Sequence, residues 1–586
     1  MTSAASDLPG AVRARAELDS AELARAEPAG AELARAALDS AHVGDIRGAL
    51  GTISVDDLAA RTSATAKLKT LLAIVGPGLI VMVGDNDAGA FSTYGQAGQN
   101  YGTHLLWTFV LLIPVLYVNQ EMVLRLGAVS GVGHARLILE RFGRFWGAFS
   151  VIDLFLLNAL TIITEFIGIT LAAGYFGVPK IVAVLLAALV IVASAMTGSF
   201  RRFERIAIAF CAGSLLLIPL YVLSHPPAGQ IATGFVLPSL PGGGGQLGTV
   251  MLLIIGIVGT TVAPWQLFFQ QSYVIDKRIT PRFIPYEKAD LVIGIAVVIV
   301  GGAALMGASA AAFAGTPAAG HFTDAAGLAA GIAASAGKVA GALFAVALLD
   351  AAMIGAFAVS LSTAYALGDV LGLKHSLHRG VSQAKGFYVM YAALIAGAAT
   401  IVLIPGSPLG LFTEGVQVLA GVLLPSATVF LLMLCNDRAV LGPWVNGRFT
   451  NAFTGAVIAL LVMLSLILVA SVTFPHISSR QILMIMIAFA GLALIAVAAI
   501  LARSRGPEAD VQTSPADRAE SRRAEPDRLT RPDTLSKENW RMPALTMLAP
   551  APMSVSRRLC LAGMWIYLVI AMTAVVFRIA EAAIGH

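Results

Sequence analysis

The stretch Val83-Gly-Asp-Asn-Asp-Ala-Gly-Ala90 interrupts an apolar segment at the depth where a membrane-spanning helix would cross the middle of a bilayer. A second interruption, Gly259-Thr-Thr-Val-Ala-Pro-Trp-Gln266, lies near the middle of the chain. A helix break exposed to lipid would leave backbone groups without hydrogen bonds, at a cost of several kcal/mol each, so such breaks persist where they line a polar cavity. Two breaks in corresponding halves of a membrane protein therefore predict a transport site between them.

The composition is typical of a protein that crosses a bilayer many times. Of the 586 residues, 57% are hydrophobic and 12% are charged, and the mean hydropathy is +0.81. This leaves too little polar surface for a water-soluble protein of this size. The formal charge of +5 lies mainly in the loops, so we interpret it as a topology signal and expect no nucleic-acid partner.

Apolar runs of about 20 residues recur from residue 68 onward, and each is long enough to cross a hydrocarbon core of roughly 30 Å. We expect spans near 70–96, 104–125, 146–174, 180–198, 204–224, 247–275, 288–314, 339–368, 387–405, 412–434, 452–474, 482–502 and 559–578. The expected organisation is an Ala/Glu/Arg-rich cytosolic extension over 1–66, a transporter core over 67–502, a disordered charged linker over 503–556 and an additional membrane helix within 557–586.

Positive charges mark alternate loops. Arg and Lys residues precede the first span and then follow every second span, whereas 225–246 contain neither. By the positive-inside rule the N-terminus is cytoplasmic and the protein is a multi-pass protein of the cell membrane. Spans 1–5 then begin inside and spans 6–10 begin outside, and each half opens with a broken helix. The sequence thus predicts an all-α polytopic membrane protein with an inverted repeat of 5+5 helices.

The first break carries carboxylates. Asp87 lies about 17 residues into the first span, where a charged side chain costs roughly 2.5–3.5 kcal/mol, so we expect it to be a metal ligand. Asp85 and Asn86 stand beside it as further candidate ligands, and Gly84 allows the backbone to unwind and present carbonyl oxygens. The alternatives are that Asp87 caps a half-helix and that Asp85 bonds the unwound backbone.

The second break adds neutral oxygens. Thr260 offers a carbonyl and a hydroxyl, and Pro264 has no N–H, so a carbonyl near Thr260 loses its helical partner. Together the two breaks predict a hard shell made only of oxygen ligands. Such a shell suits Mg²⁺, Ca²⁺ or Mn²⁺ better than copper or zinc.

Several motifs resemble the Nramp family of divalent-metal transporters. They are Gly76-Pro-Gly-Leu-Ile, Asp87-Ala-Gly-Ala, Gln96-Ala-Gly, Leu105-Leu-Trp, Gln120, Arg125-Leu-Gly-Ala-Val-Ser-Gly, Thr164-Glu-Phe-Ile-Gly, Gly259-Thr-Thr-Val-Ala-Pro and the segment from Gln417 through Pro425 to Asn436-Asp-Arg. The resemblance covers roughly residues 68–500. It implies a LeuT-like core, with additional C-terminal helices, in which the metal lies between broken helices 1 and 6.

The chain departs from the family's pattern at the site itself. The family's span-1 signature is Asp-Pro-Gly-Asn, but Ala88 and Ala90 stand where its proline and asparagine would be. Ala263 occupies the position of the family's methionine ligand, and Trp265 that of a histidine. Loss of the soft thioether leaves a larger and harder site, which fits a partly hydrated Mg²⁺. The chain therefore looks most like the Nramp-related magnesium transporters.

The family's proton route is also incomplete here. Its span-3 acid aligns with Ile162, and its span-6 histidines align with Trp265 and Gln270. Glu165 remains as a candidate for a proton or vestibule role. We therefore expect weak or no proton coupling, with entry driven by the membrane potential.

Asp350 in span 8 and Gln417 in span 10 are further candidates for a proton or vestibule role, and a helix-to-helix hydrogen bond is the simpler role for Asp350.

Three other functions compete with magnesium transport. One is a proton-coupled Mn²⁺/Fe²⁺ importer of the ordinary Nramp type, which the missing methionine and histidine disfavour. Another is a LeuT-like symporter of an organic solute, whose carboxylate the two acids would repel. A membrane hydrolase is disfavoured because the chain has no HExxH motif. We expect no enzyme activity and no cofactor; the partners are the transported ion and the bilayer.

Overall fold

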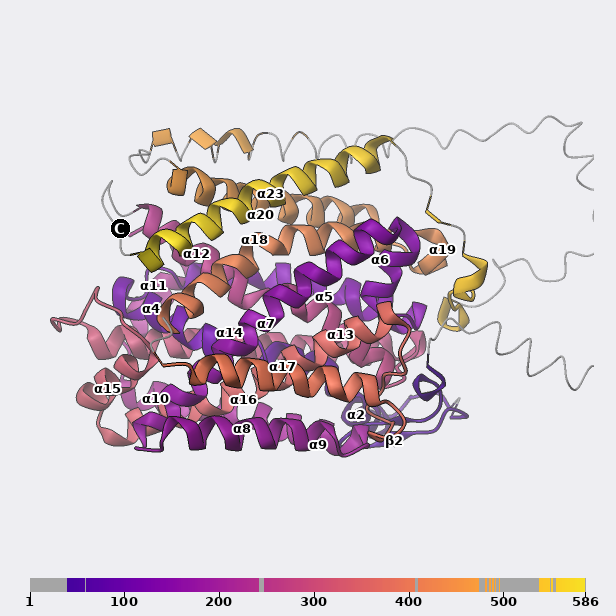
Figure 1. Cartoon of the computed structure of the whole chain (residues 1–586), viewed down its shortest axis with the longest axis horizontal. Helices are drawn as coiled ribbons and strands as arrows, with labels where there is room; N and C mark the ends of the chain where they lie inside the picture. Colours follow the sequence, from indigo (N-terminus) through magenta and orange to yellow (C-terminus); the bar gives the residue numbers. More distant parts are fainter. Residues whose placement is uncertain are drawn as a thin grey trace, which may run out of the picture.

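The computed structural model describes residues 39–57, 59–241, 247–405, 409–473, 537–548, 550–551 and 555–584, with scattered positions between 480 and 495. Within these residues, nine helices are long and apolar enough to cross a membrane, or up to ten if one bent pair is a single span. They lie nearly parallel in one bundle (Figure 1). The expectation of a polytopic all-α protein is confirmed.

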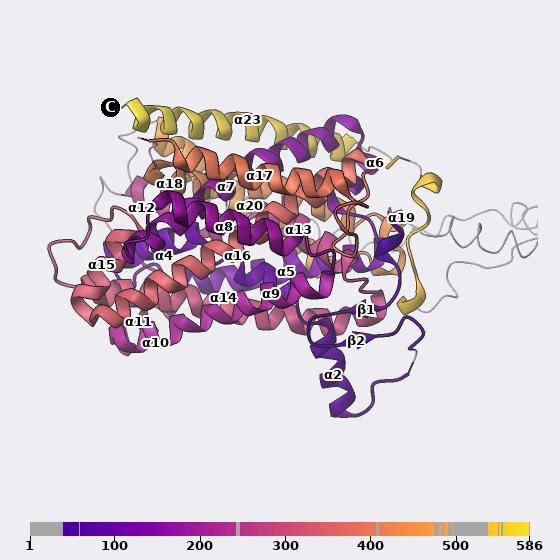
Figure 2. The ribbon, with the colours of Figure 1, turned by 60° about the horizontal axis from the view of Figure 1, so that its bottom comes forward.

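The first span consists of three pieces. Helix α2 (Ala64–Ile74) projects from the bundle (Figure 2), and α3 (Pro77–Val83) follows at an angle of 53°. Gly76 joins them with φ of 155°, a conformation that a residue with a Cβ rarely adopts. After the break at 84–87, α4 (Ala88–Tyr101) completes the span. The break in the first span therefore lies within residues 83–90, where the sequence predicts it.

The second broken span consists of α12 (Leu247–Thr261) and α13 (Pro264–Asp276). Pro264 occupies the first position of α13, where its missing N–H costs nothing because the first helical N–H groups have no intrahelical partner. The two intervening residues, Val262 and Ala263, form the break. The predicted interruption over 259–266 is confirmed.

The remaining spans form two related groups. The first group is α5 (Trp107–Ser130), α7 (Arg144–Tyr175), α8 (Lys180–Ala195), and α9 (Phe200–Gly213) with α10 (Leu217–Ser224). The second group is α14 (Ile284–Phe313), α16 (Lys338–Leu371), α17 (Lys385–Leu403) and α18 (Leu409–Cys435). Helices α3 and α4 pack on α14 as α13 packs on α5, and α7 packs on α16 as α8 packs on α17. This exchange of equivalent neighbours is the pattern of an inverted repeat.

Some elements were not predicted from the sequence. Short helices α6 (His134–Phe142), α11 (Ala228–Val236) and α15 (Ala325–Ala336) lie in connections between spans. Beyond the repeat, α20 (Arg448–Thr473) and α23 (Val555–Ile584) correspond to the predicted spans near 452–474 and 559–578, and they pack against α18 and against each other. Most of the expected span at 482–502 lies outside the described residues.

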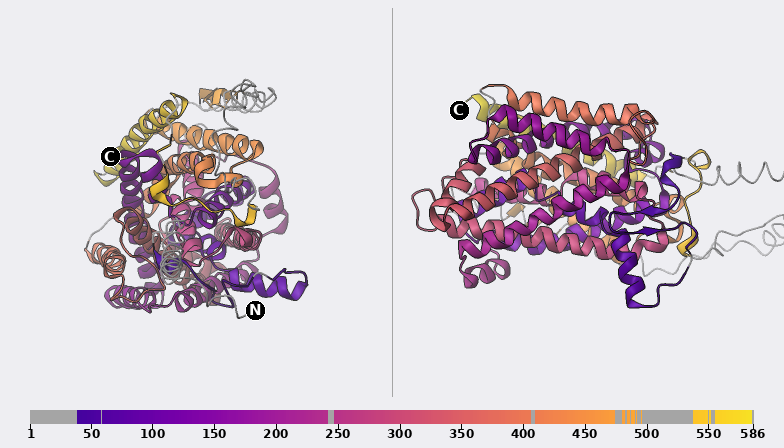
Figure 3. Two further views of the ribbon diagram at one scale, coloured as in Figure 1. Left: turned by 90° about the vertical axis from the view of Figure 1, so that its right-hand side faces the viewer. Right: turned by 90° about the horizontal axis from the view of Figure 1, so that it is seen from below.

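The segments that precede and follow the core meet at one end of the bundle (Figure 3). Strands β1 (Ile46–Arg47) and β2 (Thr52–Ile53) form an antiparallel hairpin, preceded by the short helix η1 (Ser40–His42). We call this end of the bundle the hairpin end. At Gly48 a Cβ would collide with the carbonyl oxygen of Ala73 in α2, so glycine permits this close packing. The described part of the 1–66 extension thus includes a hairpin docked on the core.

The described part of the segment 503–556 is also ordered. Helices η6 (Lys537–Asn539) and η7 (Leu545–Met547) lie at the hairpin end. Met542 N donates to Val129 O over 3.4 Å, and Trp540 packs against Gly442. At residues 537–548 these contacts differ from the expectation of a disordered linker, because apolar side chains such as Met542 find a buried position on the core. Residues 503–536 of the expected linker lie outside the described residues.

Candidate metal-transport site

The two helix breaks face each other in the middle of the bundle. A Cβ at Gly84, where α3 ends, would lie 3.4 Å from the Trp265 ring at the start of α13 and 3.4 Å from the Ala358 side chain of α16. All three residues are buried. The structure therefore brings together the two interruptions that are 176 residues apart in the chain, counted from residue 84 to residue 260.

Two carboxylates meet at the N-terminus of α4. Asp87 is the N-cap residue, and its Oδ1 accepts a hydrogen bond from Ala90 N over 2.8 Å. Glu165 of α7 accepts one from Ala88 N through Oε2 over 3.1 Å. A helix N-terminus favours negative charge because its first N–H groups are free and its dipole is positive there. A Cβ at Gly355 of α16 would lie 2.7 Å from the Glu165 carboxylate and 2.9 Å from Asp87 Cβ, so these two acids are neighbours.

The third acid of the centre is Asp85, which is fully buried. Neither of its carboxylate oxygens receives a hydrogen bond within the described part of the chain, although the amide of Gln266 lies beside it. Asn86 turns to the opposite side, where its Nδ2 donates to Val298 O of α14 over 3.2 Å. The structure thus directs Asp85 and Asn86 to different neighbours.

The second break contributes a hydroxyl and a polar chain. Thr260 Oγ1 is buried and has no hydrogen-bond partner among the described residues. The next residue, Thr261, bonds the hydroxyl of Tyr94 over 2.7 Å, and its carbonyl accepts from Gln266 Nε2 over 3.3 Å. Ala263 caps α13 without any side-chain hydrogen bond. The position that would carry a thioether in the family pattern therefore presents only a methyl group.

The remaining candidates divide into one near the centre and one away from it. Gln417 of α18 packs directly on Gly89 beside Asp87, and its Nε2 has no partner within the described chain. Asp350 of α16 faces Gly213 of α9 instead. The structure joins Gln417, but not Asp350, to the acids at the first break.

This centre offers oxygen ligands without a closed protein cage. No group of three or more His, Cys, Asp or Glu side chains is placed to hold a metal ion anywhere in the described ranges. An ion between the breaks would therefore depend on one or two carboxylates together with carbonyl, hydroxyl, amide and water oxygens. Mg²⁺ is bound in this way in many proteins, because it dehydrates reluctantly and keeps several waters.

The hairpin end is closed over the first span. Lys277, just after α13, donates through Nζ to Ile74 O over 2.6 Å, to Val75 O over 2.8 Å and to Glu204 Oε1 over 2.6 Å. Glu204 also accepts from Ala49 N of the hairpin segment over 2.6 Å. The α2 and α3 pieces, α9, α13 and the hairpin are thereby joined at one point.

A second set of contacts fixes the hairpin to the loop before α17. The guanidinium of Arg379 donates hydrogen bonds to the carboxylate of Asp39. Burial alone would raise the pKa of Asp39, but the hydrogen bonds and the charge of Arg379 outweigh it and lower this pKa to about 2. His375 Nε2 lies 2.8 Å from Asp369 Oδ1. Burial opposes protonation of His375, but the Asp369 carboxylate outweighs it and raises the pKa of His375 to about 9. Both pairs are therefore charged at neutral pH.

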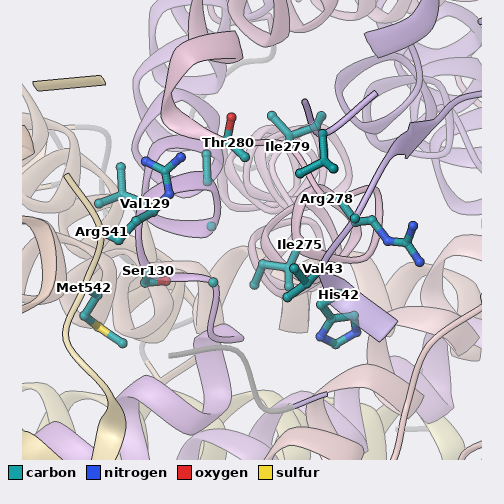
Figure 4. Close-up of a pocket in the computed structure, with 15 residues that line it drawn as sticks. His42, Val43, Val129, Ser130, Ile275, Arg278, Ile279, Thr280, Arg541 and Met542 are labelled. Carbon is teal, nitrogen blue, oxygen red and sulfur yellow. The ribbon is translucent and has the colours of Figure 1, made fainter. Parts of the chain in front are cut away.

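A cavity of about 280 Å³ lies at the hairpin end and not at the breaks (Figure 4). It is lined by the hairpin segment, the last residues of α5, the end of α13 and residues 541–542. His42 and Arg278 line one side and Arg541 and Met542 the other (Figure 4). The cavity thus lies where both flanking segments meet the repeat, which supplies nine of its fifteen lining residues.

Comparison with known proteins agrees with this architecture. Residues 78–471 match the family model described as "Natural resistance-associated macrophage protein-like", Nramp. The chain belongs to the Nramp family. Nramp proteins are membrane transporters, so the chain is a transporter and not an enzyme.

Individual relatives span nearly the same core. The divalent metal cation transporter MntH of Ralstonia nicotianae is 30% identical over 425 residues, which cover 68% of this chain and 91% of the relative. MntH of Staphylococcus aureus is 26% identical over 436 residues, covering 70% and 93%. A mutant of the Eremococcus coleocola manganese transporter superposes with a TM-score of 0.59 at 23% identity, covering 78% of this chain and 97% of that one. The LeuT-like fold expected from the resemblance is confirmed.

Sequence reasoning missed several polar residues of this Nramp core. Tyr94, Gln120 and Gln266 line the centre, and Gln270 and Glu287 continue the polar surface toward the hairpin end. One signal was present, because Gln266 and Gln270 are four residues apart and so share a face of α13. Another was the acid Glu287 in the first turn of an apolar span.

Proposed function

We propose that this chain carries divalent metal ions across the cell membrane by alternating access, with Mg²⁺ as the preferred ion and Mn²⁺ as a second substrate. Membership of the Nramp family and the names of its relatives support the substrate class. The preference for Mg²⁺ rests on one observation, the pairing of buried Asp85 and Asp87 with Ala263 in place of any soft ligand. Carboxylate, carbonyl and water oxygens suit Mg²⁺, Ca²⁺ and Mn²⁺, and the site lacks the soft ligand that would favour other transition metals.

Proton coupling is weak or absent in this proposal. His134 is buried, but its ring bonds Gln271 on α13 toward the hairpin end, and no histidine of the described chain lies at the breaks. Entry of Mg²⁺ needs no second ion, because the membrane potential supplies about 2.3 kcal/mol per charge per 100 mV, or roughly 4.6 kcal/mol for two charges.

The proposal places the hairpin end in the cytoplasm. Arg and Lys residues gather in the connections at this end, including Arg136, Arg205, Arg278 and Arg379, whereas residues 225–241 at the opposite end contain none. A cysteine replacing Gly229 should react with a membrane-impermeant maleimide on intact cells, whereas one replacing Arg47 should not, with Cys560 changed to serine in both. The reverse pattern would refute the orientation.

The function is tested by reconstitution into liposomes. Uptake of Mg²⁺, Mn²⁺ and Ca²⁺ should be measured side by side, with a pH dye inside, for the wild type, Asp87→Asn and Asp350→Asn. We expect Mg²⁺ uptake without matching acidification, loss of uptake in Asp87→Asn, and unchanged uptake in Asp350→Asn, since Asp350 faces α9. Full transport by Asp87→Asn would remove the proposed site, and acidification that tracks metal entry would refute the absence of coupling.

A further inference from the structure

A line of buried amides leads from the helix breaks toward the hairpin end. Gln120 of α5 donates through Nε2 to Gln266 Oε1 over 2.7 Å, and Gln266 lies beside Asp85. One turn further along α13, Gln270 is fully buried, and neither polar atom of its amide has a hydrogen-bond partner within the described chain. Four residues of helix advance about 6 Å. Polar groups therefore continue past the site along the face of α13.

The line ends at a carboxylate of α14. Glu287 of α14 is fully buried, and both of its oxygens lack hydrogen-bond partners among the described residues. The amide of Gln270 lies beside it. Along α14, Glu287 precedes Val298, the partner of Asn86, by eleven residues, or about 16 Å of helix. Glu287 thus lies between the depth of the breaks and the hairpin end.

Neighbouring acids are satisfied where Glu287 is not. Asp290 accepts from the backbone N–H groups of Gly76, Gly78 and Leu79 over 2.7 to 3.3 Å. Glu204 accepts from Lys277 and from the hairpin backbone.

Three carboxylates therefore share one ammonium group in a region closed to solvent, and the ammonium is bound to Glu204. A buried carboxylate without a partner is strongly unfavourable, so this position is prepared for a positive charge.

Building on the proposed function, we infer that Glu287 and Gln270 form a second divalent-cation site, a station that an ion occupies after leaving Asp85 and Asp87 on its way to the hairpin end. One carboxylate and one amide oxygen leave most of the coordination shell to water, which suits an ion that travels partly hydrated. Lys277 bonds the carbonyls of Ile74 and Val75 and so ties the first span to the end of α13 at the hairpin end. In this inference the ion leaves the station when α2 and α3 move.

The test uses the full chain and two readouts, Mn²⁺ binding in detergent measured by electron paramagnetic resonance and metal uptake into liposomes. The wild type should bind two Mn²⁺ ions and Glu287→Gln one. The maximal uptake rate of Glu287→Gln should fall about tenfold, while the external KM changes less than about twofold, because the entry site is intact. Asp350→Asn is the matched control, since it also converts a carboxyl of a spanning helix to an amide but faces Gly213 of α9.

A second variant guards against misfolding. Gln270→Glu keeps every existing acid and adds a carboxylate, so it should bind the second Mn²⁺ more tightly and release it more slowly. If Glu287→Gln binds two ions and transports like the wild type, the station is refuted. One bound Mn²⁺ in a wild type that transports normally also refutes the station but leaves the proposed function intact. A wild type that neither binds nor transports divalent ions would overturn the proposed function as well.

Discussion

The buried ammonium of Lys277 fastens the first span at the hairpin end, and replacing it should loosen that end. Lys277→Met removes three charge-assisted hydrogen bonds and leaves Glu204 as an unpaired buried charge, with both side chains fully shielded from solvent. Breaking a buried ion pair in this way costs about 3–5 kcal/mol. In an open state without this pair, the substitution costs nothing, so the closed state is destabilised by at least about 3 kcal/mol relative to the open state. The ratio of open to closed molecules should then rise roughly 150-fold.

A cysteine at position 49 reports this opening. Ala49, in the turn between β1 and β2, is 2% exposed, Cys211 and Cys435 are buried, and Cys560 can be replaced by serine. Maleimide labelling of Ala49→Cys should be about a hundredfold faster in the Lys277→Met background.

The control is Lys288→Met, whose partner Glu121 lies 2.9 Å away in a pair that is 36% exposed on the lysine side. Such pairs contribute about 0.2–1 kcal/mol, so labelling should change by less than about fivefold. Equal labelling rates in the two variants would refute the role of Lys277 as a lock.

Three other changes test separate parts of the structure. The pKa of His375 is about 9 in the folded protein and about 6.5 in the unfolded chain, so its ion pair stabilises the fold fully below pH 6.5 and is lost as the pH rises through 9. The free energy of unfolding should therefore fall by up to about 3 kcal/mol between pH 6.5 and 9. Thermal melts of His375→Gln should show a flatter dependence of stability on pH. Tyr567→Phe removes a 2.9 Å hydrogen bond from α23 to the α18 backbone and should cost about 1 kcal/mol in the unfolding free energy; an unchanged melting temperature would contradict this coupling. Ala263→Met combined with Ala90→Asn restores a soft ligand and should shift uptake toward Mn²⁺ and Cd²⁺ in competition assays, whereas unchanged selectivity would contradict the role of ligand softness.

The sequence predicted the features that local chemistry dictates. Pro264 marks a helix break because it lacks an N–H, and Asp87 stands out because a charged side chain in a membrane-spanning helix is costly. Gly84 lies at the first break, but its φ of −62° is an ordinary helical value, so the break does not depend on glycine's freedom there. The order and the approximate limits of the spans followed from apolar runs in the same way.

Directions of side chains were harder to predict. Where a helix is broken, the side chains of successive residues point in different directions. The sequence alone therefore does not predict that Asn86 turns to α14 while Asp85 faces Gln266. The importance of Glu287 depends on which neighbours already have partners, and Asp290 next to it is satisfied by a helix two hundred residues away in the chain. The docking of the hairpin depends on tight backbone approach at Gly48, which carries no local pattern.

The two segments that flank the family core both rest on its hairpin end. The hairpin contacts α2 directly, and residues 541–542 line the same cavity as His42 and Gly44. A chain trimmed to residues 64–473 would keep every proposed ligand and the bonds of Lys277 yet lose the flanking segments that pack over this end, including the bond from Ala49 to Glu204. The rate of metal transport by such a truncated protein should differ from that of the intact protein. Kinetics measured on the truncated protein would therefore not describe the full-length chain.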